Sequence, residues 1–170
     1  MDYVDIDYTV KNIGSIEYPT QEMCFQAHGA PNFRDHDGTR TFVMTKQGFR
    51  KMVKVRHNIN GRLWFQRYSL PVDKATTIQD EFVPTGPLLA TVSRNYKWLI
   101  APTVLSGYPT DMLYNREYSC LHCNQNSCLK PGQTDKFKQR IYFLRGSLED
   151  LLTRWESDFF NFSKNHTLKS

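Results

Sequence analysis

The sequence predicts an α+β protein, mainly an antiparallel β-sheet with a C-terminal amphipathic helix packed on one face and a cysteine-rich loop. Three observations predict this class. Short segments of alternating polarity are separated by Gly, Pro and Asn, one apolar stripe at helical spacing lies near the end of the chain, and three of the four cysteines fall between residues 120 and 128. The chain has 170 residues, the usual length of one domain, so we expect a single globular domain over 1–164 and a frayed tail over 165–170.

The N-terminal segment predicts a half-buried strand. Every second residue over 3–10 is apolar or aromatic, starting at Val4. Because the side chains of a strand point alternately to its two faces, one face of this strand can be buried. Thr20 then predicts the cap of a short helix through about His28, followed by a loop to Gly38.

Further strands are predicted from the same alternation, at residues 40–46, 49–57, 62–69, 76–83, 88–93, 96–104 and 137–145. The pair Asn60-Gly61 predicts a hairpin turn, because both residues tolerate positive φ. Pro102 lacks a backbone N–H, so we expect the strand over 96–104 to lie at a sheet edge or to end early. Residues 106–132 are expected to form the loop that contains the cysteine cluster.

The helix is predicted from Ser147 to about Phe162. Ser147 is a favourable N-cap, and Glu149 and Asp150 in the first turn suit the positive end of the helix dipole. The apolar residues follow helical spacing on one face: Leu148, Leu151, Leu152, Trp155, Phe159 and Phe162.

Charge is segregated along the chain. Residues 38–72, called here the basic segment, contain eight Lys and Arg residues and no acidic residue, whereas the whole chain has a net charge of +5. The first 22 residues contain five acidic residues and one lysine. A cluster of cations attracts phosphates, so the basic segment predicts a nucleic-acid-binding surface.

On the predicted hairpin, one face is expected to be wet and basic, and it contains Met52, Lys54, Arg56, Phe65 and Arg67. The aromatic rings of the segment could stack on unpaired bases. The predicted nucleic-acid-binding residues are Arg50, Lys51, Lys54, Arg56, Arg62, Phe65 and Arg67. Three alternatives stay open: an acidic or other protein partner, pairing of the cations with the acidic N-terminal strand, and simple solvation of a sheet face.

The cysteines predict a structural zinc site. Cys120, Cys123 and Cys128 follow a C-x2-C-x4-C pattern, and thiolates two residues apart at a turn can bind one Zn²⁺. The fourth ligand is open among His122, Cys24 and His28. An alternative set pairs Cys24 and His28, on one helix face, with Cys120 and Cys123 and leaves Cys128 out; reduced thiols or a disulfide would need no metal.

The compartment follows from the first residues and the cysteines. Met1–Asp5 lack the basic and apolar regions of a secretory signal, so we expect an intracellular protein, cytoplasmic or nuclear, with reduced cysteines. The longest apolar run, Trp98–Ala101, is far shorter than the ~20 residues that cross a bilayer, so no membrane association is expected.

No catalytic residue is predicted. Cys24 with His57 or His122 is the arrangement nearest to a cysteine protease, but no local motif of such an enzyme accompanies it. The sequence therefore favours a non-catalytic accessory or regulatory protein that binds nucleic acid, RNA in preference to DNA, and contains structural zinc. The alternative function is a zinc-stabilised protein–protein interaction module, of the kind that a viral accessory protein would use against a host factor.

Overall fold

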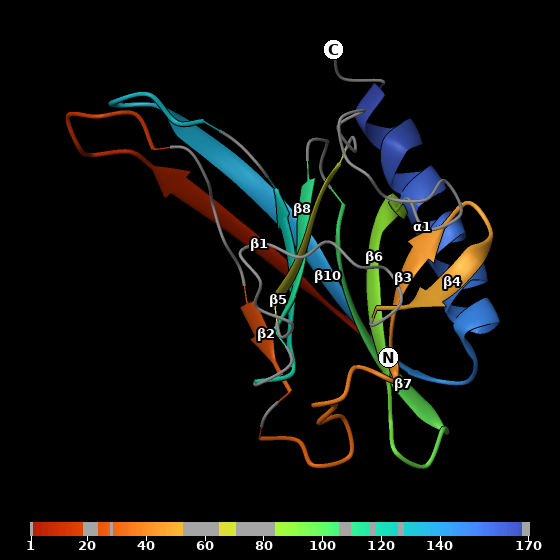
Figure 1. The fold of residues 1–170 in the computed structure, drawn as a ribbon. Coiled ribbons are helices and arrows are strands. Elements are labelled where there is room, and N and C mark those ends of the chain that lie inside the picture. The colour runs from red at the N-terminus through yellow and green to blue at the C-terminus, as the bar shows by residue number, and fades with distance from the viewer. Residues whose placement is uncertain are drawn as a thin grey trace.

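The fold has three layers, a six-stranded sheet between a four-stranded sheet and one helix (Figure 1). The computed structural model describes residues 2–18, 24–27, 29–52, 65–70, 84–105, 110–115, 118–125 and 128–167. The six-stranded sheet contains, in spatial order, β1 (Tyr3–Lys11), β10 (Thr134–Arg145), β7 (Trp98–Val104), β6 (Pro84–Val92), β3 (Thr41–Thr45) and β4 (Gly48–Lys51). The four-stranded sheet contains β2 (Cys24–Gln26), β9 (Cys120–Gln125), β8 (Thr110–Asn115) and β5 (Phe65–Leu70). The described pairings are antiparallel, which confirms the predicted α+β class with mainly antiparallel sheet.

The main core lies between the two sheets. Strands of the six-stranded sheet contribute Val43, Leu89 and Ile100, and the facing strands contribute Met112 and Leu121, all at most 4% exposed. These side chains stand at alternate positions of their strands, so the apolar half of each strand faces the other sheet.

The helix α1 (Leu148–Thr167) covers the other face of the six-stranded sheet (Figure 1). Leu151 and Trp155 are buried there, as the predicted apolar stripe requires. The indole N–H of Trp155 donates to Thr103 Oγ1 over 3.0 Å, so its polar atom is satisfied within the core. A Cβ added at Gly86 would clash with the end of the Met44 side chain and lie 3.2 Å from the Trp155 ring, so a larger residue there would require these side chains to shift.

The predicted helix start is confirmed. The backbone N–H of Asp150 donates to Ser147 Oγ, and Asp150 Oδ2 accepts from the Ser147 backbone N–H over 2.8 Å. These reciprocal bonds stabilise the first turn. The helix continues to Thr167, five residues beyond the predicted end.

Three expectations for the chain are corrected. Cys24–Gln26 is a strand, not part of a helix, and the expected loop over 106–132 contains strands β8 and β9. Pro102 lies in β7, between β10 and β6, so this strand is interior. Its missing N–H is accommodated where the β6–β7 ladder is interrupted, between the pairs Leu88–Thr103 and Thr91–Ile100.

The predicted hairpin is not formed by the described residues of its two arms, because β4 and β5 belong to different sheets. β4 pairs with β3, and β5 pairs with β8. The Asn60-Gly61 turn and the strand expected at 76–83 lie outside the described residues.

Within the part of the chain that the structure describes, no helix combines the length and apolar character that crossing a membrane requires.

Candidate metal centre

Three metal-binding side chains meet where β2 pairs with β9. Cys24 on β2 stands directly opposite His122 on β9, and Cys120 lies two residues before His122 on the same strand. Cross-strand partners share a face of a sheet, and so do residues two apart, so the three side chains project from one face. One ligand atom from each lies within 4.8 Å of the others. Cys24, Cys120 and His122 therefore lie close enough together to hold one metal ion.

The cluster, named here the Cys2His cluster, is mostly shielded from solvent. Cys120 is 3% exposed and His122 is 8% exposed, whereas Cys24 on the short strand β2 is exposed. A site with this burial excludes most water from two ligands and leaves one side accessible for an ion to enter.

The strand alternation directs Cys123 away from the cluster and into the core between the sheets. Its thiol donates to the Pro87 carbonyl over 3.2 Å, and burial raises the pKa of Cys123 far above its ordinary value. Cys123 therefore packs in the core between the sheets and is not part of the Cys2His cluster, although the sequence predicted it as a ligand.

Cys128 is also separate from the Cys2His cluster. It is exposed, and its thiol donates to the carboxylate of Glu17 over 2.6 Å. This hydrogen bond raises the pKa of Cys128. The C-x2-C-x4-C pattern thus contributes only its first cysteine, and His28, the other predicted ligand, lies outside the described residues.

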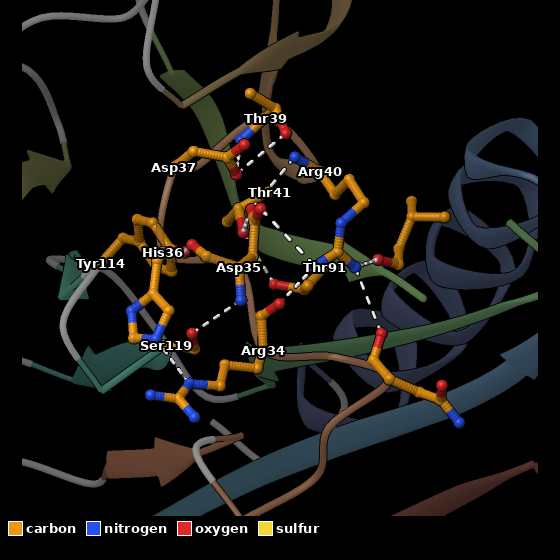
Figure 2. Close-up of polar contacts among 12 residues, drawn as sticks. Arg34, Asp35, His36, Asp37, Thr39, Arg40, Thr41, Thr91, Tyr114 and Ser119 are labelled. Atoms are coloured by element: carbon orange, nitrogen blue, oxygen red, sulfur yellow. Dashed lines mark hydrogen bonds and ion pairs between the residues drawn. The ribbon is translucent and has the colours of Figure 1, made fainter. Parts of the chain in front are cut away.

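A buried polar network fixes the start of β9, next to the cluster (Figure 2). Ser119, which precedes Cys120, has a φ of 48°, and its hydroxyl accepts from the backbone N–H of Asp35 over 2.8 Å. Its carbonyl accepts from the N–H of Ala27, just after β2. The Tyr114 hydroxyl donates to the Asp35 carbonyl. The loop around Asp35 therefore joins β8 to the start of β9, and Ala27, after β2, is joined to the same point of β9 through Ser119.

The same network connects to the six-stranded sheet through the Asp35 carboxylate. It accepts from the Thr41 hydroxyl over 2.7 Å and lies 3.7 Å from the Arg40 guanidinium, which in turn donates to the Val92 carbonyl (Figure 2). Burial raises the pKa of Asp35, and a hydrogen bond shared with Asp35 lowers the pKa of Asp37. The two ligand-bearing strands are thus attached to the rest of the fold by buried polar groups rather than by apolar packing alone.

The ligand chemistry suits a soft or borderline metal. Two thiolates and one imidazole are typical zinc ligands, whereas Ca²⁺ and Mg²⁺ bind oxygen ligands. Zinc bound to two thiolates holds their sulfurs about 3.7 Å apart, as follows from a Zn–S bond of about 2.3 Å in tetrahedral geometry. The three ligand atoms lie within 4.8 Å of one another, which is close enough for one metal ion.

The basic segment is divided by the fold. Arg40 is buried beside Asp35, and Met52, predicted to lie on the wet face, is fully buried. Lys46 and Lys51 are exposed, and within the described residues neither takes part in an ion pair. Arg50 is half-buried and donates to Gln47 Oε1 over 2.9 Å.

The other predicted nucleic-acid-binding residues are placed only in part. Phe65 and Arg67 lie on β5, and Arg67 is aligned through Leu113 of β8 with His122. The basic segment therefore reaches the sheet that contains the Cys2His cluster. Lys54, Arg56 and Arg62 lie outside the described residues.

A scan of the chain against protein-family models found no match, and a search of curated proteins found none either.

Proposed function

We propose that this protein is a zinc-stabilised, non-catalytic binding module whose partner is nucleic acid, RNA in preference to DNA. The observation that carries the proposal is the Cys2His cluster, which joins segments almost a hundred residues apart in the sequence. We place this function inside the cell, in the cytoplasm or nucleus, where the four free cysteines stay reduced.

In this proposal zinc is structural, because the pairing of β2 with β9 contributes little stability without a metal ion. The strand has three residues and forms the edge of its sheet. Such a short ladder contributes little stability of its own. A metal that binds one side chain of β2 and two of β9 would fix the strand, because metal-binding free energy is coupled to folding.

The charge distribution supports a nucleic-acid partner. The three acidic residues of the N-terminal strand region pair within the fold, Asp2 with Arg154, Asp5 with Arg140 and Asp7 with Lys138. These acids are therefore not the partners of the basic segment. Within the described residues its exposed cations, Lys46 and Lys51, remain available for phosphates.

Metal analysis tests the zinc part of the proposal. Purified protein should contain about one zinc per chain, and a chelator should lower its melting temperature. Cys120→Ser should lose the metal and the chelator response, whereas Cys128→Ser, a matched change at an exposed thiol outside the cluster, should keep both. Wild-type protein with well under one zinc per chain contradicts a zinc site.

Binding to oligonucleotides tests the partner. Fluorescence anisotropy with a labelled 12-nucleotide oligouridine, and with the DNA of matching length, should show binding that weakens steeply as salt rises. We expect the RNA to bind more tightly. No detectable binding of either oligomer at 50 mM salt contradicts a nucleic-acid partner.

A second candidate function, protein–protein interaction, is favoured by an exposed apolar loop. Ile13 is 91% exposed, Ile16 is 75% exposed and Tyr18 is 55% exposed, at the end of the projecting β1–β10 ribbon (Figure 1). Asn12 Nδ2 donates to the Ile16 and Leu129 carbonyls, so the loop has a defined conformation. If this loop binds a protein, Ile13→Asp should abolish that association and leave RNA binding unchanged.

A further inference from the structure

The β6–β7 hairpin presents aromatic rings to solvent beside unpaired cations. Tyr96 is 70% exposed and Trp98 is 45% exposed. Arg94, Lys97 and Arg145 are exposed as well, and none of the three takes part in an ion pair within the described residues. We call these five residues the hairpin-tip surface.

The rings and cations belong to one surface. Trp98 and Arg145 are directly opposite each other on β7 and β10, so their side chains share a face. The backbone of Lys97 lies beside the end of β10, because its carbonyl accepts from the Gly146 N–H over 3.2 Å, and Arg94 and Tyr96 are exposed in the same turn. The first acidic residues after Arg145 in the sequence are Glu149 and Asp150, in the first turn of α1. The Asp150 carboxylate accepts a hydrogen bond from the Ser147 N–H over 2.8 Å.

The hairpin tip is built by a fixed set of hydrogen bonds. Ser93 Oγ accepts from the Trp98 N–H over 3.0 Å and donates to Asn95 Oδ1, which also accepts from the Lys97 N–H. The Arg94 N–H donates to the Asn32 carbonyl, which attaches the tip to the neighbouring loop at the lower end of Figure 1. The turn is therefore ordered before any partner binds.

Tyr96 has a backbone conformation that this network imposes. Its φ is 58°, in the left-handed region that aromatic residues rarely adopt. Asn or Gly would fit the position with less strain, yet an aromatic residue that is 70% exposed stands there. Such strain at an exposed, ordered position is typical of a residue that serves a ligand.

Single-stranded nucleic acid has the matching chemistry. Its unpaired bases stack on aromatic rings, and its phosphates pair with Lys and Arg. A duplex hides its base faces, and an acidic peptide would use the cations but leave both rings exposed. We propose that the hairpin-tip surface binds single-stranded nucleic acid, with bases stacked on Tyr96 and Trp98 and phosphates held by Arg94, Lys97 and Arg145. This inference rests on the proposed function and assigns its base-binding surface outside the basic segment.

The metal centre and this surface are connected through β2. Phe143, two residues before Arg145 on β10, is 38% exposed, and its ring meets Phe25 of β2 edge to face with centroids 6.2 Å apart. Phe25 follows the ligand Cys24 in sequence. Loss of the metal should therefore loosen the apolar neighbour of the hairpin-tip surface and weaken binding of the oligomer by a smaller factor than loss of a stacking ring.

Anisotropy titrations of matched variants test the assignment. Trp98→Ala and Tyr96→Ala should each weaken oligouridine binding about tenfold, the effect of one lost base stack. Removing all three cations of the hairpin-tip surface should lower the slope of log K against log salt by about 2, since each phosphate contact on a single strand contributes about 0.7. Lys136→Ala, an exposed cation of β10 outside the surface, is the control and should change affinity less than twofold.

Trp98 fluorescence gives an independent readout. Base stacking should quench its emission during a titration with unlabelled oligouridine. Trp98→Phe should retain the affinity within about threefold and lose this quenching, which separates stacking from a change in folding.

The outcomes distinguish this inference from the proposed function. If wild-type protein binds the oligomer but the Trp98, Tyr96 and cation variants bind equally well, the hairpin-tip assignment is wrong and nucleic-acid binding stands. Weakened binding in a Lys46→Glu, Lys51→Glu variant would then locate the site in the basic segment. If wild-type protein binds neither RNA nor DNA, both the proposed function and the hairpin-tip assignment fail.

Discussion

The acidic N-terminal strand and the basic segment have opposite charge in the sequence, but the fold treats them differently. The acids of β1 pair with cations of β10, as in Asp5 with Arg140 over 2.6 Å, and add to the cohesion of the sheet. The basic segment is split, because Arg40 enters the core and Lys46 and Lys51 stay in solvent. A run of like charges in a sequence therefore does not by itself predict a charged surface. Whether a residue adds to the surface charge depends on its burial and on the ion pairs that the fold gives it.

Of the substitutions that compare the two regions, Arg40→Ala should lower the free energy of unfolding most. It is 9% exposed and is the cation beside the buried Asp35 carboxylate. Arg40→Ala leaves that carboxylate without its partner, so we expect a loss of about 3–5 kcal/mol in the free energy of unfolding. Urea denaturation measures it, and Lys51→Ala, in the same segment but exposed, should change the free energy by less than about 0.5 kcal/mol. Equal effects of the two changes would show that Arg40 is a surface cation after all.

A smaller loss in the free energy of unfolding is expected when the ion pairs of the acidic strand β1 are broken. Arg140 is ion-paired with Asp5 and with Asp158 of α1, and its side chain is 12% exposed. Hydrogen bonding to Asp5 raises the pKa of Arg140, so the guanidinium is charged at every accessible pH. Arg140→Ala should lower the free energy of unfolding by about 2 kcal/mol, the range for hydrogen bonds between charged groups.

Lys138 is the matched control on the same strand. Its ion pair with Asp7 spans 3.4 Å, but the two side chains are 34% and 66% exposed. Solvent screens such a pair, so Lys138→Ala should cost less than about 1 kcal/mol in the same urea titration. A Lys138 variant as unstable as the Arg140 variant would mean that charge number, not burial, determines the contribution of this strand.

Local pattern predicted the six strands of the larger sheet, β5 and the helix, because alternation and the apolar stripe are properties of neighbouring residues, but it did not predict β2, β8 or β9 as strands. It could not predict that β4 and β5 join different sheets, since a period of two identifies a strand but not its partner. β2 was mistaken for a helix for the same reason. Its three residues carry no clear period, and pairing with β9 determines their conformation.

The candidate site was predicted in part. The sequence predicts Cys24, Cys120 and His122 as candidate ligands, but it also predicts Cys123, because the composition of the segment indicates a loop. Interpreted as a strand, the same residues place Cys120 and His122 on one face and Cys123 on the other. The sequence did not predict the proposed hairpin-tip surface, because two cations and two aromatic residues in five positions are common, and only the exposure and the φ of Tyr96 distinguish them.

The smallest effect concerns pH, and it contrasts two acids of the loop that precedes the basic segment. Burial raises the pKa of Asp35, so the folded protein keeps its proton to higher pH than the unfolded chain does. Its contribution to stability is complete below about pH 3.8 and is lost as pH rises through the raised pKa. The pKa of Asp37 is lowered by its hydrogen bond to Asp35, so its contribution is present above about pH 3.8 and is lost as pH falls. Urea titrations between pH 3 and 7 should therefore show opposite slopes in the difference between wild type and each variant, Asp35→Asn and Asp37→Asn. If the two differences changed with pH in the same direction, burial would not raise the pKa of Asp35. The Asp35 carboxyl group, at the centre of the network in Figure 2, would then be accessible to water.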